Sequence, residues 1–584
     1  MKDGLPEDLS LAETEVNDPT VSAGAALLSR LKTLGVDYIF ANSGTDFPPV
    51  IEGLAEAAAK KMKLPHTVIT PHETASTAMA HGYYLATRKA QAVMVHTNVG
   101  LANAVIGVIN ARADNIPMLV FSGRTPTTEK DRFGSRTVPI GWGQEMADQT
   151  ALVREACKWD YELRFPEQIY DVVDRGHAIA HSTPSGPVYM SLPREVLCER
   201  VPAAGAERRP QMQAAKTAPP PDDLKRAAKL LAEAKNPVIF AQRGTGSQQG
   251  FEALSRLAEE WAIPVCQYWA VQLAVPTGHP MHSSPAPGPL LATADVILVI
   301  DSLAPWSPDV KEPKEDCTVI QLALDPLFSQ TPIRNFRSDI SLPGEITPSL
   351  LALKAEMDKL LAAHAPRNAS RKKAITSQNA IGRGSRRAKV EIEQNGAYLT
   401  KPSVSALLSK ALETHDSSVF AELGCQMPFM DLTRADSWFE SPHSGGLGWG
   451  FPAAMGFKLA RPEKTVVATV GDGSYIFSNP VACHQIAEAM NISIIVIILN
   501  NSEWGAVRQS VLDLYPDGYA AKANSVPLTE ISPSPDFTLV AQASRAWARS
   551  VKTVQQLEDA LQGALAHTLS NKGLALIEVA VARN

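Results

Sequence analysis

The sequence predicts three doubly wound α/β domains, each built on a parallel sheet with helices on both faces. Two observations lead to this prediction. The 584-residue chain is 45% hydrophobic and 20% charged, which is an ordinary composition for a globular protein with several hydrophobic cores. In addition, short and almost continuously apolar runs alternate with helical patterns along the chain. Such runs are typical of strands that are buried on both faces of a parallel sheet.

The apolar runs fall into three blocks. The first block contains HTVIT, AVMVH, PMLVF and PVYMSL, at residues 66–70, 92–96, 117–121 and 187–192. The second contains PVIFA, VILVI and TVIQL, at residues 237–241, 296–300 and 318–322. The third contains SVFAEL, TVVATV, ISIIVIIL and LALIEVAV, at residues 418–423, 465–470, 492–499 and 574–581. Because such sheets bind ligands at the carboxyl ends of their strands, the residues after these runs are the candidates for a functional site.

Two stretches separate the blocks. Residues 201–222 are rich in alanine, proline and charged residues, and residues 363–395 are strongly basic and poor in large apolar residues. We interpret both as linkers, although a basic run such as 363–395 could also bind an anionic partner. The predicted domains are therefore residues 20–200, 223–362 and 396–584.

Charge and cysteine content exclude several classes of protein. The net charge of −6 argues against nucleic-acid binding, which normally requires a basic surplus. The six cysteines contain no CxxC pair, so we expect neither a disulfide framework nor a zinc ribbon. The first 20 residues lack the basic start and apolar run of a signal peptide, and the longest apolar run is too short for a membrane helix. We therefore expect a soluble, cytoplasmic protein.

The sharpest motif follows the strand TVVATV. Gly471-Asp472-Gly473-Ser474 comes directly after this strand, and Asn500-Asn501 follows the next one, ISIIVIIL. Neighbouring parallel strands would bring these carboxylate and amide oxygens to one edge of the sheet, and oxygen atoms are the ligands that Mg²⁺ prefers. The free amides of a helix that starts after the turn could also accept a diphosphate.

This GDG…NN spacing resembles the cofactor motif of thiamine diphosphate enzymes. The resemblance to the acetolactate synthase and benzoylformate decarboxylase group extends over nearly the whole chain. It implies a pyrimidine-binding, a central and a diphosphate-binding domain, with thiamine diphosphate and Mg²⁺ as cofactors. The implied metal ligands are Asp472, the side chain of Asn501 and the main-chain carbonyl of Glu503. The implied cofactor-binding residues are Glu73, Gly424, Leu447, Gly471, Asp472, Gly473, Ser474, Asn501 and Trp504.

Two further segments support the resemblance. Residues 444–456, SGGLGWGFPAAMG, resemble a GGLGxxxPAAIG segment of the family, in which a bulky residue, here Leu447, lies under the cofactor and bends it. His72-Glu73 opens a helix of small residues and resembles the start of the matching helix in acetolactate synthases. The resemblance implies that Glu73 hydrogen-bonds the aminopyrimidine ring and activates the cofactor. The alternative is a carboxylate that only interacts with the helix dipole.

Three positions bear on the substrate. His96 ends the strand AVMVH, where benzoylformate decarboxylase carries a histidine that relays protons, and an imidazole titrates near neutral pH. Thr45 lies where that decarboxylase has a serine on the substrate carboxylate, and Ser43 could serve instead. Gln144 lies in GQEMAD, which resembles the FQEAD loop of acetolactate synthases, and a loop glutamine without function is equally compatible. The second histidine of the decarboxylase has no counterpart at residues 301–306.

The resemblance favours a thiamine diphosphate- and Mg²⁺-dependent, non-oxidative decarboxylase or carboligase of 2-oxo acids, with an aldehyde or ketone as acceptor in ligation. It implies a homodimer or homotetramer. The alternatives are an acetolactate synthase-type enzyme, a lyase of 2-hydroxyketones or 2-hydroxyacyl thioesters, and a homologue that has lost turnover. We expect no FAD, because the middle block offers only a lone GxG turn at residues 244–246. A nucleotide-dependent dehydrogenase is disfavoured because no GxGxxG with a downstream acid is present.

Overall fold

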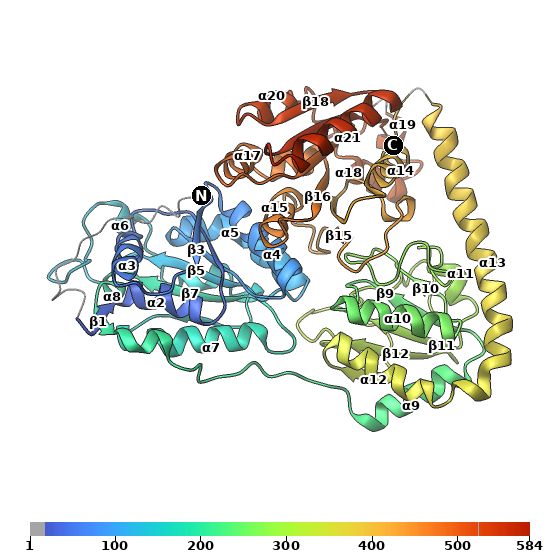
Figure 1. The fold of residues 1–584 in the computed structure, drawn as a ribbon, viewed down its shortest axis with the longest axis horizontal. Coiled ribbons are helices and arrows are strands. Elements are labelled where there is room, and N and C mark those ends of the chain that lie inside the picture. Colours follow the sequence, from blue (N-terminus) through green and yellow to red (C-terminus); the bar gives the residue numbers. More distant parts are fainter. Residues whose placement is uncertain (1–17, 397, 524, 584) are drawn as a thin grey trace.

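The computed structural model describes residues 18–396, 398–523 and 525–583, and it confirms three α/β domains with parallel sheets (Figure 1). Most of the stretch on which we based the absence of a signal peptide lies outside the described residues. Within them, no helix is long and apolar enough to cross a membrane. All six cysteines are free, as expected.

The N-terminal domain contains a six-stranded parallel sheet of order β3-β2-β4-β5-β7-β6. Its strands are β2 (Tyr38–Ala41), β3 (His66–Ile69), β4 (Ala92–Val95), β5 (Leu119–Arg124), β6 (Asp160–Glu162) and β7 (Val188–Pro193). Its main helices are α2 (Ala23–Thr33), α3 (Pro48–Ala59), α4 (Glu73–Thr87), α5 (Thr97–Ala113) and α7 (Ile169–His181). Alternate strand residues point into two separate cores, one shared with α4 and α5 and the other with α2, α3 and α7. Burial on both faces explains the continuous apolar runs.

The middle domain has a five-stranded parallel sheet of order β10-β9-β11-β12-β13. Its strands are β9 (Pro237–Ala241), β10 (Val265–Cys266), β11 (Val296–Ile300), β12 (Thr318–Ala323) and β13 (Ile340–Pro343). Its main helices are α9 (Pro221–Glu233), α10 (Gln248–Glu260) and α12 (Ile346–Asp358). These helices pack with one face of the sheet into a single core, and a smaller core covers the other face.

The C-terminal domain has a six-stranded parallel sheet of order β15-β14-β16-β17-β19-β18. Its strands are β14 (Ser417–Glu422), β15 (Trp438–Glu440), β16 (Thr465–Gly471), β17 (Ile495–Asn500), β18 (Trp547–Val551) and β19 (Ala575–Ala580). Its main helices are α14 (Lys401–Leu412), α15 (Gly450–Ala460), α16 (Asp472–Phe477), α17 (Pro480–Ala489), α18 (Gly505–Leu514) and α21 (Val554–Leu569). The central strands β16 and β17 carry the GDG and NN motifs at their carboxyl ends.

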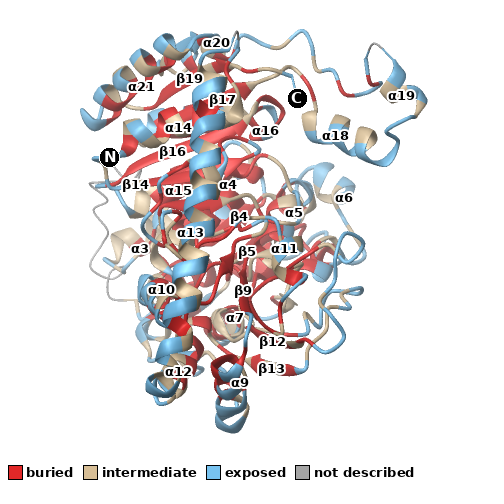
Figure 2. Ribbon diagram, turned by 90° about the vertical axis from the view of Figure 1, so that its right-hand side faces the viewer, coloured by how far each residue is buried: buried red, intermediate tan, exposed pale blue. Residues whose placement is uncertain are grey.

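The two predicted linkers differ in structure. Residues 201–222 pass mostly as extended chain from the first domain to α9, but residues 363–395 form most of one long helix, α13 (Leu361–Gln394), along the edge of the molecule (Figure 1). Figure 2 shows this helix largely exposed. An exposed helix needs no apolar stripe, so the absence of apolar periodicity did not exclude it. Arg371 attaches it to the middle domain by donating to the carbonyls of Trp261 and Ala262, which follow α10.

The N-terminal and C-terminal domains meet where α4 packs against α15. Glycines make this contact close. A Cβ atom at Gly82 would overlap the carbonyl oxygen of Ala453, and one at Gly456 would overlap that of Met79. Because α4 begins at Glu73 and α15 follows the glycine-rich loop around Leu447, this helix pair connects two segments that the sequence predicts to be functional.

Candidate active site

Three neighbouring strand ends form the candidate site in the C-terminal domain. Strand β16 pairs in parallel with β14 on one side and with β17 on the other, so that Gly471 lies beside Leu499. The structure therefore brings Asp472, at the start of α16, to the same sheet edge as Asn500 and Asn501. This is the arrangement that the spacing of the two motifs predicted.

Asp472 lies buried at the centre of this edge. Its Oδ1 accepts a hydrogen bond from Gly473 N at 2.9 Å, and its Oδ2 accepts one from Ser502 N at 2.7 Å. Burial raises the pKa of Asp472 above its usual range, so a nearby cation would stabilise the carboxylate. Asn501 Oδ1 accepts from Glu503 N at 3.2 Å, which turns the chain back toward Asp472.

The residues present fit a magnesium ion and a diphosphate. Carboxylate, amide and carbonyl oxygens from Asp472, Asn501 and Glu503 form a hard donor set. Ser474 Oγ, two residues into α16, is buried and makes no hydrogen bond of normal geometry to a described residue, although it lies close enough to the Glu422 carboxylate to lower its pKa. It is therefore available to an oxygen of a bound group. The described residues contain no group of three His, Cys, Asp or Glu side chains that could hold a metal, but the predicted set does not depend on such a group.

Glu422 ties the glycine-rich loop to the sheet, and the sequence reasoning missed it. It ends β14, is fully buried, and accepts hydrogen bonds from Gly448 N and Gly450 N, both at 2.6 Å. Burial raises its pKa to about 7. Leu447 immediately precedes these amides and remains half-buried. The signal in the sequence was an acid at the end of an otherwise apolar strand.

Two glycines allow close packing at the same edge. A Cβ atom at Gly473 would overlap the ring of Trp504, so the indole lies directly against the GDG turn. A Cβ atom at Gly424, just after β14, would overlap the carbonyl of Thr469 on β16. Both glycines thus lie at strand ends of the C-terminal sheet.

Glu73 lies in the N-terminal domain, buried at the first residue of α4. Its Oε1 accepts from Asn42 Nδ2 at 2.9 Å, and its Oε2 accepts from Asn103 Nδ2 at 3.0 Å. Asn42 follows β2 and Asn103 lies in α5, so two elements hold the carboxylate in one orientation. A Cβ atom at Gly100 would come within 2.9 Å of Glu73 Oε1.

His96 lies between an acid and an amide. It follows β4, and its Nδ1 forms a short contact with Asp46 Oδ1, while its Nε2 lies 3.0 Å from Gln144 Nε2. The hydrogen bond to Asp46 raises the pKa of His96 above its ordinary value. Gly44 makes room for the ring, which a Cβ atom there would overlap. Asp46 was not predicted, although it is the only acid between β2 and α3.

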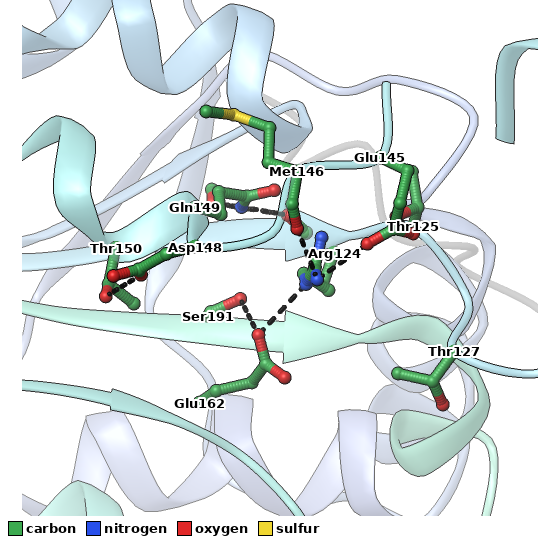
Figure 3. A network of polar contacts seen from close by, with 12 residues as sticks. Arg124, Thr125, Thr127, Glu145, Met146, Asp148, Gln149, Thr150, Glu162 and Ser191 are labelled. Carbon is green, nitrogen blue, oxygen red and sulfur yellow. Dashed lines mark hydrogen bonds and ion pairs between the residues drawn. The ribbon is translucent and has the colours of Figure 1, made fainter. Parts of the chain in front are cut away.

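Thr45 and Gln144 line a small cavity of about 20 Å³ beside Asp46. Thr45 and Ser43 are both exposed, so either hydroxyl can reach a bound molecule. A cavity of about 700 Å³ lies between α13 and α14 and contains none of the predicted site residues. Gln144 belongs to a loop that a polar network around Arg124 attaches to β5 (Figure 3).

Three family models match the chain in order along the sequence. The thiamine pyrophosphate enzyme N-terminal TPP binding domain matches residues 21–152. The central domain of the same enzymes matches residues 224–353, and their C-terminal TPP binding domain matches residues 422–579. Each matched range falls within one of the three sheets and its helices.

Curated proteins of different activities are similar to the chain over most of its length. A probable 2-ketoarginine decarboxylase from Pseudomonas aeruginosa is 26% identical, over 96% of this chain and 94% of that protein. A probable acetolactate synthase large subunit from Methanocaldococcus jannaschii is 27% identical, over 94% of this chain and 90% of that protein.

Solved structures share the fold. A 4-hydroxybenzoylformate decarboxylase from Rhodococcus jostii superposes with a TM-score of 0.76 at 22% identity, over 97% of this chain and all of that one. A benzoylformate decarboxylase from Polynucleobacter necessarius superposes with a TM-score of 0.77 at 21% identity, over 96% of this chain and 99% of that one.

Proposed function

Because the chain belongs to the thiamine pyrophosphate enzyme family, we propose that it is a thiamine diphosphate- and Mg²⁺-dependent, non-oxidative decarboxylase or carboligase of 2-oxo acids. The observation that carries this proposal is the contact of His96 with Asp46 at a strand end. A decarboxylase needs a proton donor there once carbon dioxide has left, and this pair supplies one.

The C-terminal sheet edge would hold the cofactor. Thiamine diphosphate, when bound, supplies the electron sink for cleavage of the bond next to the carbonyl. Asp472, the Asn501 amide and the Glu503 carbonyl would hold Mg²⁺. Ser474 Oγ and the amides of α16 beyond Gly473, whose N–H donates to Asp472, would take the diphosphate, and Leu447 would pack against the cofactor.

Glu73 would hold and move a proton at the aminopyrimidine ring. Its carboxylate is buried at the first residue of α4, where it would meet a ring nitrogen of the bound cofactor. Asn42 and Asn103 fix the directions of both oxygens, so little reorganisation is required when the ring binds.

His96 would act as the acid toward the substrate. The Asp46 carboxylate stabilises the protonated imidazole, so the cationic form of His96 persists to higher pH than in a free imidazole and can donate a proton. Thr45 Oγ1 would contact the substrate carboxylate, and Gln144 would contact either His96 or the substrate.

We infer a homodimer or homotetramer. The family resemblance implies that Glu73 of one subunit meets the diphosphate site of another. In this chain Asn42 and Asn103 hold Glu73 from its own N-terminal domain. We expect no FAD in the middle domain.

The second candidate is an acetolactate synthase-type enzyme. It is favoured by the GQEMAD loop, whose Gln144 lies against His96, and by the similarity to the archaeal acetolactate synthase subunit. A lyase of 2-hydroxyketones or 2-hydroxyacyl thioesters would use the same cofactor and the same Glu73.

A substrate panel tests the proposal. The protein is incubated with aliphatic, aromatic and guanidino 2-oxo acids, with and without thiamine diphosphate and Mg²⁺, and carbon dioxide and acyloin are measured. We expect carbon dioxide release from at least one acid that requires both cofactors. Acetolactate from pyruvate as the sole product would favour the second candidate, and no turnover by cofactor-loaded protein would contradict the proposal.

A further inference from the structure

The loop that carries Gln144 leaves β5 and returns to it. It starts at Thr125, directly after the strand, passes through the short helix α6 (Ile140–Gly143), and comes back at Glu145. Most of its residues are exposed, yet Gln144 is held against Nε2 of His96. Polar contacts, rather than burial, therefore fix its position: some lie at the base of the loop, and others lie farther out, where Thr127 N donates to Glu195 and Arg194 donates to the carbonyl of Gly134.

The carboxylate of Glu145 closes the base of the loop. Thr125 Oγ1 donates to its Oε2 at 2.6 Å, and Arg124 Nη2 lies 2.7 Å from its Oε1. The guanidinium of Arg136 forms a further ion pair with Oε2. One acid thus joins the end of β5, the start of the loop and its return. Glu145 directly follows Gln144, so these contacts fix the backbone next to the amide that meets His96.

The arginines that hold Glu145 are themselves anchored. Arg124 donates to the carbonyl of Met146 at 2.9 Å and pairs with Glu162 on β6 at 3.0 Å (Figure 3). Arg136 donates to the carbonyl of Pro126 at 2.7 Å. The side chains of the two arginines are only 10% and 9% exposed, whereas that of Glu145 is 33% exposed. These pairs are therefore shielded from water on the arginine side, unlike fully exposed surface ion pairs, which contribute little.

We propose that Glu145 is a positioning residue that holds Gln144 against His96. The contact matters because its effect on the protonation of the His96 ring is opposite to the effect of Asp46. The Asp46 carboxylate can only accept a hydrogen, so it favours a protonated Nδ1 and the charged ring. Gln144, with its amide nitrogen toward Nε2, favours the neutral ring instead. Glu73 is the other charged group that acts on His96, and Glu145 does not touch it.

A titration of His96 tests the proposal without turnover. The imidazole pKa is measured by NMR in wild type, Glu145→Gln, Gln144→Ala and the double variant, and the His96 signal is assigned with His96→Ala. We expect both single variants to raise the His96 pKa by the same amount, and the double variant to add nothing. Glu129→Gln is the matched control, because Glu129 lies in the same loop and accepts a hydrogen bond from Trp142 Nε1, and among the described residues it has no hydrogen bond or ion pair with Gln144, Glu145 or His96.

Turnover provides the second readout and rests on the proposed function. In Glu145→Gln we expect kcat to fall about tenfold, with a smaller change in KM. When Glu145→Gln is introduced into the Gln144→Ala variant, kcat should fall by less than about twofold, since the effects of coupled positions are not additive. Glu145→Asp, which keeps the charge, should recover part of the loss and serves as the second variant if Glu145→Gln folds poorly.

Two results would overturn the role of Glu145. One is an unchanged His96 pKa in Glu145→Gln with normal folding by circular dichroism. The other is an equal effect of Glu145→Gln with and without Gln144. If the wild type turned over no 2-oxo acid, the proposed function would fail, but the titration would still decide whether Glu145 positions Gln144.

Discussion

The contact between His96 and Asp46 is the main determinant of proton transfer at the residue scale. Asp46 raises the pKa of His96, so the acid form persists to higher pH and is lost as the pH rises through that pKa. Asp46→Asn should lower the pKa and move the alkaline limb of the kcat profile to lower pH. A shift of one unit would reduce kcat about tenfold above the limb. A pH–rate profile checks this.

The matched control uses His96 itself. In His96→Ala the alkaline limb of the kcat profile should be absent. Adding Asp46→Asn to this variant should then change the profile little. If Asp46→Asn lowered activity equally at all pH values, in both backgrounds, its effect would be structural and would not pass through the imidazole.

Asp472 is the residue on which cofactor binding depends most. Its carboxylate is the only side-chain acid in the proposed metal set, and the metal would link it to the diphosphate. Asp472→Ala should therefore lose bound thiamine diphosphate after dialysis against Mg²⁺-containing buffer, while far-UV circular dichroism stays native. Retention of the wild-type cofactor content would exclude Asp472 as a ligand.

At the residue scale, a site residue could be predicted only where the signal for it lay close by in the sequence. His96 and Asp472 were proposed as site residues because each directly follows a strand, and Glu73 was proposed because it opens the helix after one. Asp46 and Glu422 were missed because their partners, His96 and the amides of Gly448 and Gly450, lie 50, 26 and 28 residues away, and such pairings arise only from the tertiary fold. The sequence therefore indicated the candidate site but not the acids that position its parts.

The helix pair α4–α15 governs stability at the scale of elements. Glycine to alanine in a helix interior normally stabilises by about 1 kcal/mol. At Gly82, however, the new methyl group would overlap the carbonyl oxygen of Ala453, and overpacking typically costs about 1–3 kcal/mol. Gly82→Ala should therefore lower the midpoint of thermal unfolding.

Gly384→Ala is the control for this prediction. Gly384 lies in the exposed helix α13 with open space around its Cα, so the same substitution should raise the midpoint slightly or leave it unchanged. A Gly82→Ala protein at least as stable as wild type would show that α4 and α15 can move apart without loss of stability.

Among the strands, the sequence predicted the central ones and missed some of those at the sheet edges. Central strands such as β4, β11 and β17 were found because burial on both faces makes them apolar throughout. The edge strands β6 and β15 were missed because they are short and partly polar. Residues 363–395 were interpreted as a linker without an assigned secondary structure, and they form most of helix α13, whose residues are mostly exposed and which Arg371 attaches to the middle domain.

At the scale of the whole molecule, a site shared between chains makes a complementation test possible. Glu73→Gln and Asp472→Ala chains carrying different affinity tags are expressed together, and protein that carries both tags is purified. Each parent variant should be inactive. If Glu73 of one chain meets Asp472 of the other, a dimer of the two has one intact site and about half of the wild-type activity. A mixed dimer as inactive as its parents would contradict the shared site.

The most direct measurement is the exchange of the C2 proton of bound thiamine diphosphate for deuterium, because it requires no knowledge of the substrate. It tests whether the three domains build a working thiamine diphosphate site in which Glu73 is the activator. Wild-type protein with Mg²⁺ should exchange the proton rapidly. Glu73→Gln should bind the cofactor but exchange it about 10²–10⁴-fold more slowly, since it loses a proton-transfer group. Equal exchange rates in the two proteins, at equal cofactor content, would contradict the assignment of Glu73.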